Sequence, residues 1–153
     1  MLKKAALVLV SLAVAAAASG VVLYTTNPPP AVPALSAEAV NSGKPIVVKL
    51  HAQWCPYCML TKDVWSQIED AYADRVNLLV LDFTNQANTD ASQAEARRLG
   101  LDAFFDEYAG ATGIVVILDG RTKEVTAEIG GSRDFAEYRA AIDEALNRRK
   151  TTS

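Results

Sequence analysis

Apolar side chains recur with two different spacings between residues 44 and 153, and each spacing predicts one type of element. Short runs rich in β-branched residues predict strands at 45–51, 76–83, 113–118 and 123–129. Apolar positions three or four residues apart predict helices at 55–72, 90–99 and 132–147, with shorter helical pieces at 36–42 and 103–108. This order of strands and helices predicts an α/β domain with a mixed sheet flanked by helices.

A different pattern precedes this domain. Lys3 and Lys4 are followed by an apolar run of 20 residues, 5–24, and no further charge appears before Glu38. About 20 apolar residues suffice to cross the hydrocarbon core of a membrane. Residues 1–26 therefore predict a transmembrane signal-anchor or a cleaved signal peptide, and the apolar character that continues to the end of the run favours the anchor.

Both interpretations place the rest of the chain outside the cytoplasm, because the basic end stays on the cytoplasmic side. Residues 27–43 hold four of the six prolines and predict an extended linker to a folded domain at 44–150. We expect a single-pass protein of the inner membrane with its domain in the periplasm, or a secreted periplasmic protein if the segment is cleaved.

Composition narrows the class of protein. Half of the residues are hydrophobic, which is too many for a disordered chain, and the net charge of −3 comes without the basic stripe of a nucleic-acid binder. Two cysteines are too few for a scaffold held together by disulfides. Their positions are therefore more informative than their number.

The two cysteines lie in the motif Trp54-Cys55-Pro56-Tyr57-Cys58, where a predicted strand gives way to a predicted helix. Two cysteines separated by two residues in this context indicate redox chemistry. Cys55 is at the helix N-terminus, where free N–H groups and the helix dipole lower a thiol pKa, so we expect Cys55 to be the nucleophile. Cys58 lies one turn further on the same helix face, where it can attack a mixed disulfide formed at Cys55. Pro56 suits the first helical position, because the N–H that it lacks would have no partner there.

Other interpretations of the cysteine pair stay open. A static disulfide would close too short a loop to constrain the unfolded chain much. A zinc site of the usual kind needs a second pair of ligands, which the chain lacks, so we expect no bound metal and no cofactor. Two thiolates could still hold a soft metal or bridge a cluster between two chains.

Residues 44–149 resemble the thioredoxin superfamily. The resemblance rests on the lead-in at 44–48, on Ala52-Gln53-Trp54 before the first cysteine, and on the later segments 113–114, 124–125 and 129–130. It implies a thioredoxin-like sheet of four or five strands flanked by helices, and dithiol–disulfide exchange without a cofactor. The residues that it implies for substrate binding are Trp54, Pro56, Tyr57, Ile114 and Val115.

The chain departs from this family at two positions that matter for the chemistry. Most members have a cis-proline at the position of Val115, whereas a cis bond before another residue costs about 3 kcal/mol, so we expect a trans bond here. Two interpretations follow. Either the protein binds its substrate differently from most family members, or Val115 is a core residue of the strand without a role in binding.

The second departure is Lys49, which stands where thioredoxins have a buried acid, six residues before the first cysteine. A buried ammonium would favour the Cys55 thiolate, with Asp82 on the neighbouring strand as its partner. The alternative is a lysine that reaches the surface at the sheet edge.

These features together predict a thiol–disulfide oxidoreductase. Its expected substrates are exported proteins with thiols or disulfides, which the resemblance implies are reduced with electrons from a membrane donor. An oxidase would use the same chemistry in the other direction, and the motif leaves that direction open.

Overall fold

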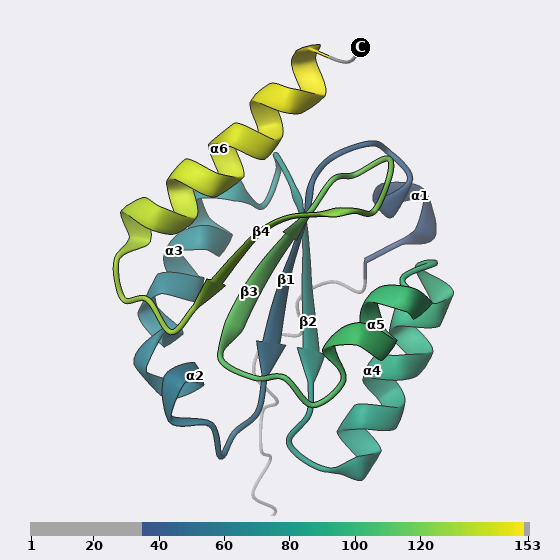
Figure 1. Cartoon of the computed structure of the whole chain (residues 1–153), viewed down its shortest axis with the longest axis vertical. Helices are drawn as coiled ribbons and strands as arrows, with labels where there is room; N and C mark the ends of the chain where they lie inside the picture. The colour runs from purple at the N-terminus through teal and green to yellow at the C-terminus, as the bar shows by residue number, and fades with distance from the viewer. Residues whose placement is uncertain (1–34, 152–153) are drawn as a thin grey trace, which may run out of the picture. The chain divides into compact units, whose positions relative to one another are not determined.

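Four strands form one mixed sheet in the computed structural model shown in Figure 1, which describes residues 35–151. The strands are β1 (Ile46–His51), β2 (Asn77–Asp82), β3 (Ile114–Leu118) and β4 (Val125–Gly130). Their order in the sheet is β2-β1-β3-β4. β1 runs parallel to β2 and antiparallel to β3, and β3 runs antiparallel to β4. The predicted mixed sheet is confirmed, with four strands in the described part of the chain.

Helices cover both faces of this sheet (Figure 1). They are α1 (Ala37–Val40), α2 (Pro56–Leu60), α3 (Lys62–Tyr72), α4 (Gln86–Arg98), α5 (Asp102–Tyr108) and α6 (Phe135–Thr151). The helices α3 and α6 pack on one face, and α4 and α5 pack on the other. The CxxC motif follows β1, the central strand that joins the parallel pair to the antiparallel pair.

The central strand β1 alternates its apolar side chains between two core clusters. Val48 and Leu50 pack toward α4 and α5, while Val47 packs toward α3 and α6. All three side chains are fully buried. Because β1 is enclosed from both faces, its first three residues, 46–48, are consecutive apolar residues rather than alternating apolar and polar ones. The end of β1 therefore holds the following loop on a rigid support.

The predicted helix at 55–72 is two helices, which corrects the sequence interpretation. Thr61 lies between α2 and α3 with φ −101° and ψ 9°. Its hydroxyl donates to the Tyr57 carbonyl over 2.8 Å. A threonine hydroxyl that bonds the carbonyl four residues earlier competes with regular helix geometry and bends a helix. The apolar spacing continues through the break, so periodicity alone cannot reveal it.

Side-chain caps set two other helix starts. Ser36 accepts a hydrogen bond from the Ala39 N–H over 3.0 Å and begins α1, as predicted. Asn85 accepts from the Asn88 N–H over 3.0 Å, so α4 begins four residues before the predicted start at 90. The sequence analysis missed this cap because the first turn of α4 has a polar sequence.

The packed domain includes α1, because Val40 is fully buried in the core beside α4 and α5. Residues within the expected linker 27–43 thus contribute to the fold. Among residues 35–151, no helix is long and apolar enough to cross a membrane. The predicted anchor at 1–26 lies outside the described residues.

Candidate functional site

The two cysteines lie at the start of α2, directly after β1. Cys55 is the N-cap residue, with extended backbone angles of φ −82° and ψ 116°, and Pro56 takes the first helical position as predicted. Both cysteines are free thiols, and each is 3% exposed. Together with Ala52 they form a small buried cluster. The motif thus brings the two sulfurs to one helix end, as the spacing predicts.

The pKa of the Cys55 thiol lies below its ordinary value. Burial alone raises this pKa, but hydrogen bonds to the sulfur lower it by more. The donors are the side chains of Thr112 and Cys58 and the backbone N–H groups of Cys58 and Tyr57. Donors that face a sulfur stabilise its thiolate form. Cys55 is therefore suited to the role of nucleophile, and Thr112 is a contributor that the sequence analysis missed.

The pKa of the Cys58 thiol is shifted the other way. Burial is the largest cause of its raised pKa, and the hydrogen bond and charge of Cys55 raise it further. Hydrogen bonds with backbone groups of Ala52 and Gly113 lower this pKa, but by less than burial and Cys55 together raise it. The Cys58 sulfur donates a hydrogen bond to the Leu50 carbonyl over 3.7 Å, which also favours the protonated form.

Two glycines make room for the Tyr57 ring beside the thiols. A Cβ atom on Gly113 would lie 2.8 Å from Tyr57 Cβ and 3.2 Å from the Cys55 sulfur. A Cβ atom on Gly131 would lie 2.8 Å from Tyr57 Cδ1. Both glycines have positive φ, at 78° and 64°, a region that side chains other than glycine rarely adopt. An open groove runs here, lined by Tyr57, Thr112, Gly113, Ile114, Gly130 and Gly131.

Val115 lies behind this groove and not in it. The Ile114–Val115 peptide bond is trans, as expected without proline. Val115 is 8% exposed and belongs to the core cluster around Trp65 and Ile117. The structure therefore supports the strand-core interpretation of Val115. Ile114 does line the groove, and Gly113 approaches the Cys55 sulfur.

A rim of exposed apolar side chains surrounds the motif. Trp54 is 61% exposed, Tyr57 60%, Met59 65% and Leu60 53%. The sequence analysis identified the first two and missed Met59 and Leu60, because their apolar character resembled that of a helix core face. Large apolar side chains exposed together mark a surface that contacts other molecules.

The loop that carries Trp54 is tied to the end of β2. The Trp54 indole N–H donates to the Thr84 carbonyl over 3.0 Å, and the Gln53 N–H donates to the Thr84 hydroxyl oxygen over 2.9 Å. The Thr84 hydroxyl in turn donates to Asp82. Asp82 also accepts from Asn88 over 2.7 Å. Burial raises the pKa of Asp82, but these hydrogen bonds outweigh it and keep the pKa low.

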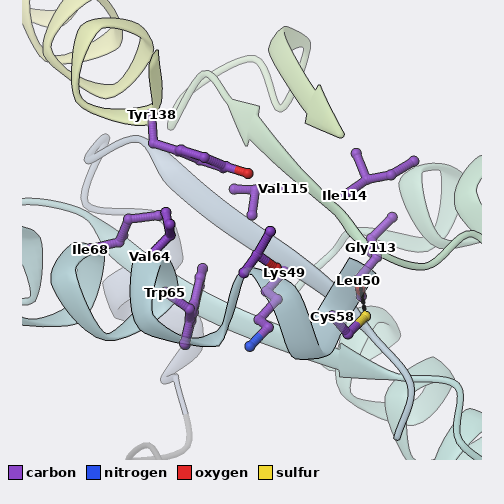
Figure 2. Close-up of a pocket in the computed structure, with 11 residues that line it drawn as sticks. Lys49, Leu50, Cys58, Val64, Trp65, Ile68, Gly113, Ile114, Val115 and Tyr138 are labelled. Atoms are coloured by element: carbon purple, nitrogen blue, oxygen red, sulfur yellow. Dashed lines mark hydrogen bonds between the residues drawn. The ribbon is translucent and has the colours of Figure 1, made fainter. Parts of the chain in front are cut away.

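Lys49 does not pair with Asp82 as expected. In the part of the chain that the structure describes, no ion pair joins the two side chains, because Asp82 is engaged with Thr84 and Asn88. The Lys49 ammonium instead lies over the Trp65 ring, 5.2 Å from its centroid. Figure 2 shows Lys49, Trp65 and Cys58 around one pocket. Burial lowers the pKa of Lys49, and the charge of Cys58 opposes that shift.

Within residues 35–151, no three side chains of histidine, cysteine, aspartate or glutamate come together as a metal site. The Nδ1 atom of His51 is buried without a hydrogen-bond partner. Burial, followed by the charge of Lys49, lowers the pKa of His51. His51 is thus a partly buried neutral side chain beside the site.

The comparisons with known proteins agree with this geometry. The family model for Thioredoxin matches residues 33–98. The Thioredoxin-like protein HCF164, chloroplastic, of Oryza sativa subsp. japonica is 39% identical over 85 residues, which cover 52% of this chain and 30% of that protein. A Thioredoxin of Acidithiobacillus ferridurans is 31% identical over 52 residues, which cover 34% of this chain and 48% of that protein. The chain thus spans less than half the length of these relatives.

A solved structure shows the same fold. The solution structure of a thioredoxin-like protein in the oxidised form superposes with a TM-score of 0.50 at 15% identity, covering 74% of this chain and 85% of that one. The mixed sheet and the motif at the start of α2 match what the resemblance implied. The chain therefore has a thioredoxin-like α/β fold, and the Thioredoxin family model matches part of this domain, residues 33–98.

Proposed function

We propose that the protein is a thiol–disulfide oxidoreductase that reduces disulfides in exported proteins. The observation that carries the proposal is the opposite pKa shift of the two thiols, lowered at Cys55 and raised at Cys58. Thiol–disulfide exchange starts with a thiolate, so the thiol with the lower pKa attacks first. The thiol with the raised pKa stays protonated until the mixed disulfide is in place.

The exchange proceeds in two balanced steps. The Cys55 thiolate attacks one sulfur of the substrate disulfide, a mixed disulfide forms, and the leaving sulfur takes a proton from solvent. Cys58 then loses its proton and attacks the Cys55 sulfur, which releases the second substrate thiol. Two electrons have passed to the substrate, and Cys55 and Cys58 are joined as a disulfide. A thiol reductant has to regenerate the pair, and we assign this role to a membrane electron donor.

The surface beside Cys55 suits a polypeptide substrate. The exposed side chains of Trp54, Tyr57, Met59 and Leu60 offer apolar contact around the motif. The groove next to Tyr57 has glycine at three of its six lining positions, so backbone is accessible there. An extended segment can approach the Cys55 sulfur along such a groove.

Location is a separate part of the proposal and rests on the sequence of residues 1–26 alone. A membrane-impermeant maleimide added to spheroplasts that express the full chain should label Cys55 before lysis. Labelling only after lysis would contradict export. The same experiment with Cys55→Ser controls for labelling elsewhere, since Cys58 is the other cysteine.

The activity is tested with the full chain and insulin as a disulfide substrate in the presence of dithiothreitol. We expect reduction well above the background rate, and none above background for Cys55→Ser. The reduction potential of the Cys55–Cys58 couple then tests the direction. A potential near about −270 mV supports a reductase, and one near about −120 mV indicates an oxidant. A wild-type chain without exchange activity would contradict the proposed function.

A further inference from the structure

A small cavity lies beside Cys58 and shares two lining residues, Gly113 and Ile114, with the groove. Its volume is about 10 Å³, close to the smallest space that holds one water molecule. Apart from Lys49, its lining consists of uncharged side chains and Cys58, including Thr61, Trp65, Val115 and Tyr138. Figure 2 shows the Lys49 side chain extending past the helix that carries Cys58, toward Trp65. A cation thus lines the same cavity as the second cysteine.

Trp65 and Glu69 hold this cation in place. Trp65 is buried, and its indole N–H donates to Glu69 Oε1 over 2.6 Å. The hydrogen bond fixes the ring, and the ring face attracts the Lys49 ammonium at 5.2 Å from its centroid. For residues 35–151, no carboxylate lies within ion-pair distance of the Lys49 ammonium. Lys49 is therefore held over Trp65 without a direct ion pair, although Glu69 is close enough for its charge to raise the Lys49 pKa.

The charges around Lys49 show which cysteine affects its pKa. Burial lowers the pKa of Lys49, while the charges of Cys58 and then Glu69 raise it and Lys62 lowers it. Along β1, His51 lies two residues away, and its own pKa is lowered in part by Lys49. Lys49 is not among the main causes of the pKa shift of either thiol, so its link to Cys58 rests on the cavity that both side chains line and on the effect of the Cys58 charge on Lys49. The sequence analysis linked Lys49 to Cys55, whereas the structure links it to Cys58.

We propose that Lys49 is a positioning residue for the second half of the exchange, in which its ammonium stabilises Cys58 as a thiolate while Cys58 attacks the mixed disulfide. This inference rests on the proposed function. In that step the proton of Cys58 leaves to water, the Cys58–Cys55 bond forms, and the bond between Cys55 and the substrate sulfur breaks with its electron pair. The Cys58 sulfur loses its negative charge when the new bond forms, so Lys49 loses its anion at the same time.

The thiol titration of Cys58 tests the proposal without any turnover. In the full chain with Cys55→Ala, Cys58 is the remaining thiol, and its thiolate absorbance near 240 nm is followed against pH. An opposite charge at close range shifts a pKa by about 1–3 units, so Lys49→Met should reduce the thiolate fraction of Cys58 at least about tenfold at a fixed pH below the pKa. Lys150→Met is the matched control, because Lys150 is an exposed lysine near the end of α6 and is not among the charges that act on Lys49. Equal titration curves for the Lys49→Met variant and its Cys55→Ala parent would overturn the proposal.

A second measurement uses the chain without substitution and remains decisive if Lys49→Met does not fold. Coupling between two groups is reciprocal, so the Cys58 thiolate must raise the pKa of Lys49 in the reduced protein. NMR titration of the Lys49 side chain should therefore give a lower pKa in the oxidised protein than in the reduced one. An unchanged pKa would contradict the proposal. Neither measurement depends on insulin reduction, so a failure of the proposed function is detected separately.

Discussion

The two sides of the dithiol differ in almost every physical respect, although one turn of helix separates the two sulfurs. On the outer side, Cys55 faces hydrogen-bond donors, a glycine-lined groove and a rim of exposed apolar side chains. On the inner side, Cys58 faces a small cavity, the Leu50 carbonyl and the Lys49 ammonium above Trp65. The outer side favours the thiolate form of Cys55. The inner side favours the thiol form of Cys58, which loses its proton when it attacks the mixed disulfide.

The difference follows from where each cysteine lies in α2. Hydrogen-bond donors at the helix N-terminus reach Cys55 because Cys55 is the N-cap of α2. Cys58 is the third residue of α2, and burial is the largest cause of its raised pKa. The position of each cysteine in α2 thus sets which thiol attacks and which thiol resolves.

The largest effects are expected when either sulfur is removed. Cys55→Ser should abolish insulin reduction, because the thiolate is the nucleophile and a serine hydroxyl does not replace it. Cys58→Ser should instead accumulate a mixed disulfide between Cys55 and the substrate, since the resolving thiol is gone. Non-reducing electrophoresis with mass spectrometry checks both. A stable mixed disulfide through Cys58 in Cys55→Ser would contradict the assignment of roles.

The next largest effect is expected at Gly113, where the groove meets the outer thiol. Gly113→Ala places a Cβ 2.8 Å from Tyr57 Cβ and 3.2 Å from the Cys55 sulfur, and a displacement of reacting groups by about 1 Å can cost about 100-fold in rate. We expect a fall in kcat/KM of about 10- to 100-fold.

Gly110→Ala is the matched control for Gly113→Ala. Gly110 has a φ of 83°, close to the 78° of Gly113, and nothing lies within 4 Å of its added Cβ. Both variants should lose about 1–2 kcal/mol of unfolding free energy from the left-handed backbone. Only Gly113→Ala should lose activity, and an equal loss in both would show that the close contact is unimportant.

A smaller effect is expected from Thr112→Val, which removes a hydrogen bond to the Cys55 sulfur. Because this bond lowers the pKa of Cys55, its loss should raise that pKa by about one unit, which is 1.36 kcal/mol. Alkylation of Cys55 should then slow about tenfold below the pKa and stay unchanged at a pH above the pKa of both proteins. Thr112→Ser keeps the donor and serves as the control. If the pH profile of Cys55 alkylation is unchanged in Thr112→Val, Thr112 does not lower the pKa of Cys55.

The smallest effect on the thiols is expected from Thr84→Val, which cuts the tie between the motif loop and Asp82. The Gln53 N–H and the Asp82 carboxylate each lose one partner, so the unfolding free energy should fall by about 1–2 kcal/mol in a urea titration. Thr89→Val is the control, since the Thr89 hydroxyl bonds only the Asn85 carbonyl of its own helix. The pKa of Cys55 should stay the same, and a shift would mean that the loop tie also tunes the outer thiol.

The sequence allows prediction of the sheet and of the motif, and the reasons are local. The apolar, β-branched run at 46–48 is typical of a central strand, and Pro56 favours a helix start after it. Together these place Cys55 at a helix N-terminus, which alone predicts a lowered pKa.

The rest of the site depends on contacts between residues far apart in the chain. Thr112 and Gly113 reach the thiols because β3 pairs with β1, and Gly131 reaches Tyr57 because β4 pairs with β3. The partner of Lys49 likewise depends on how α2 and α3 pack on the sheet. Sequence periodicity gives the face of a strand, but it does not give the atom that a long side chain meets.

The central claim is that the two thiols of the motif are unequal, and differential alkylation tests it most directly. The reduced full chain is treated briefly with iodoacetamide at pH 7, and the modified peptides are quantified by mass spectrometry. Because reactivity follows the thiolate fraction, Cys55 should be labelled at least about tenfold faster than Cys58. Equal labelling of both cysteines, or faster labelling of Cys58, would contradict the account.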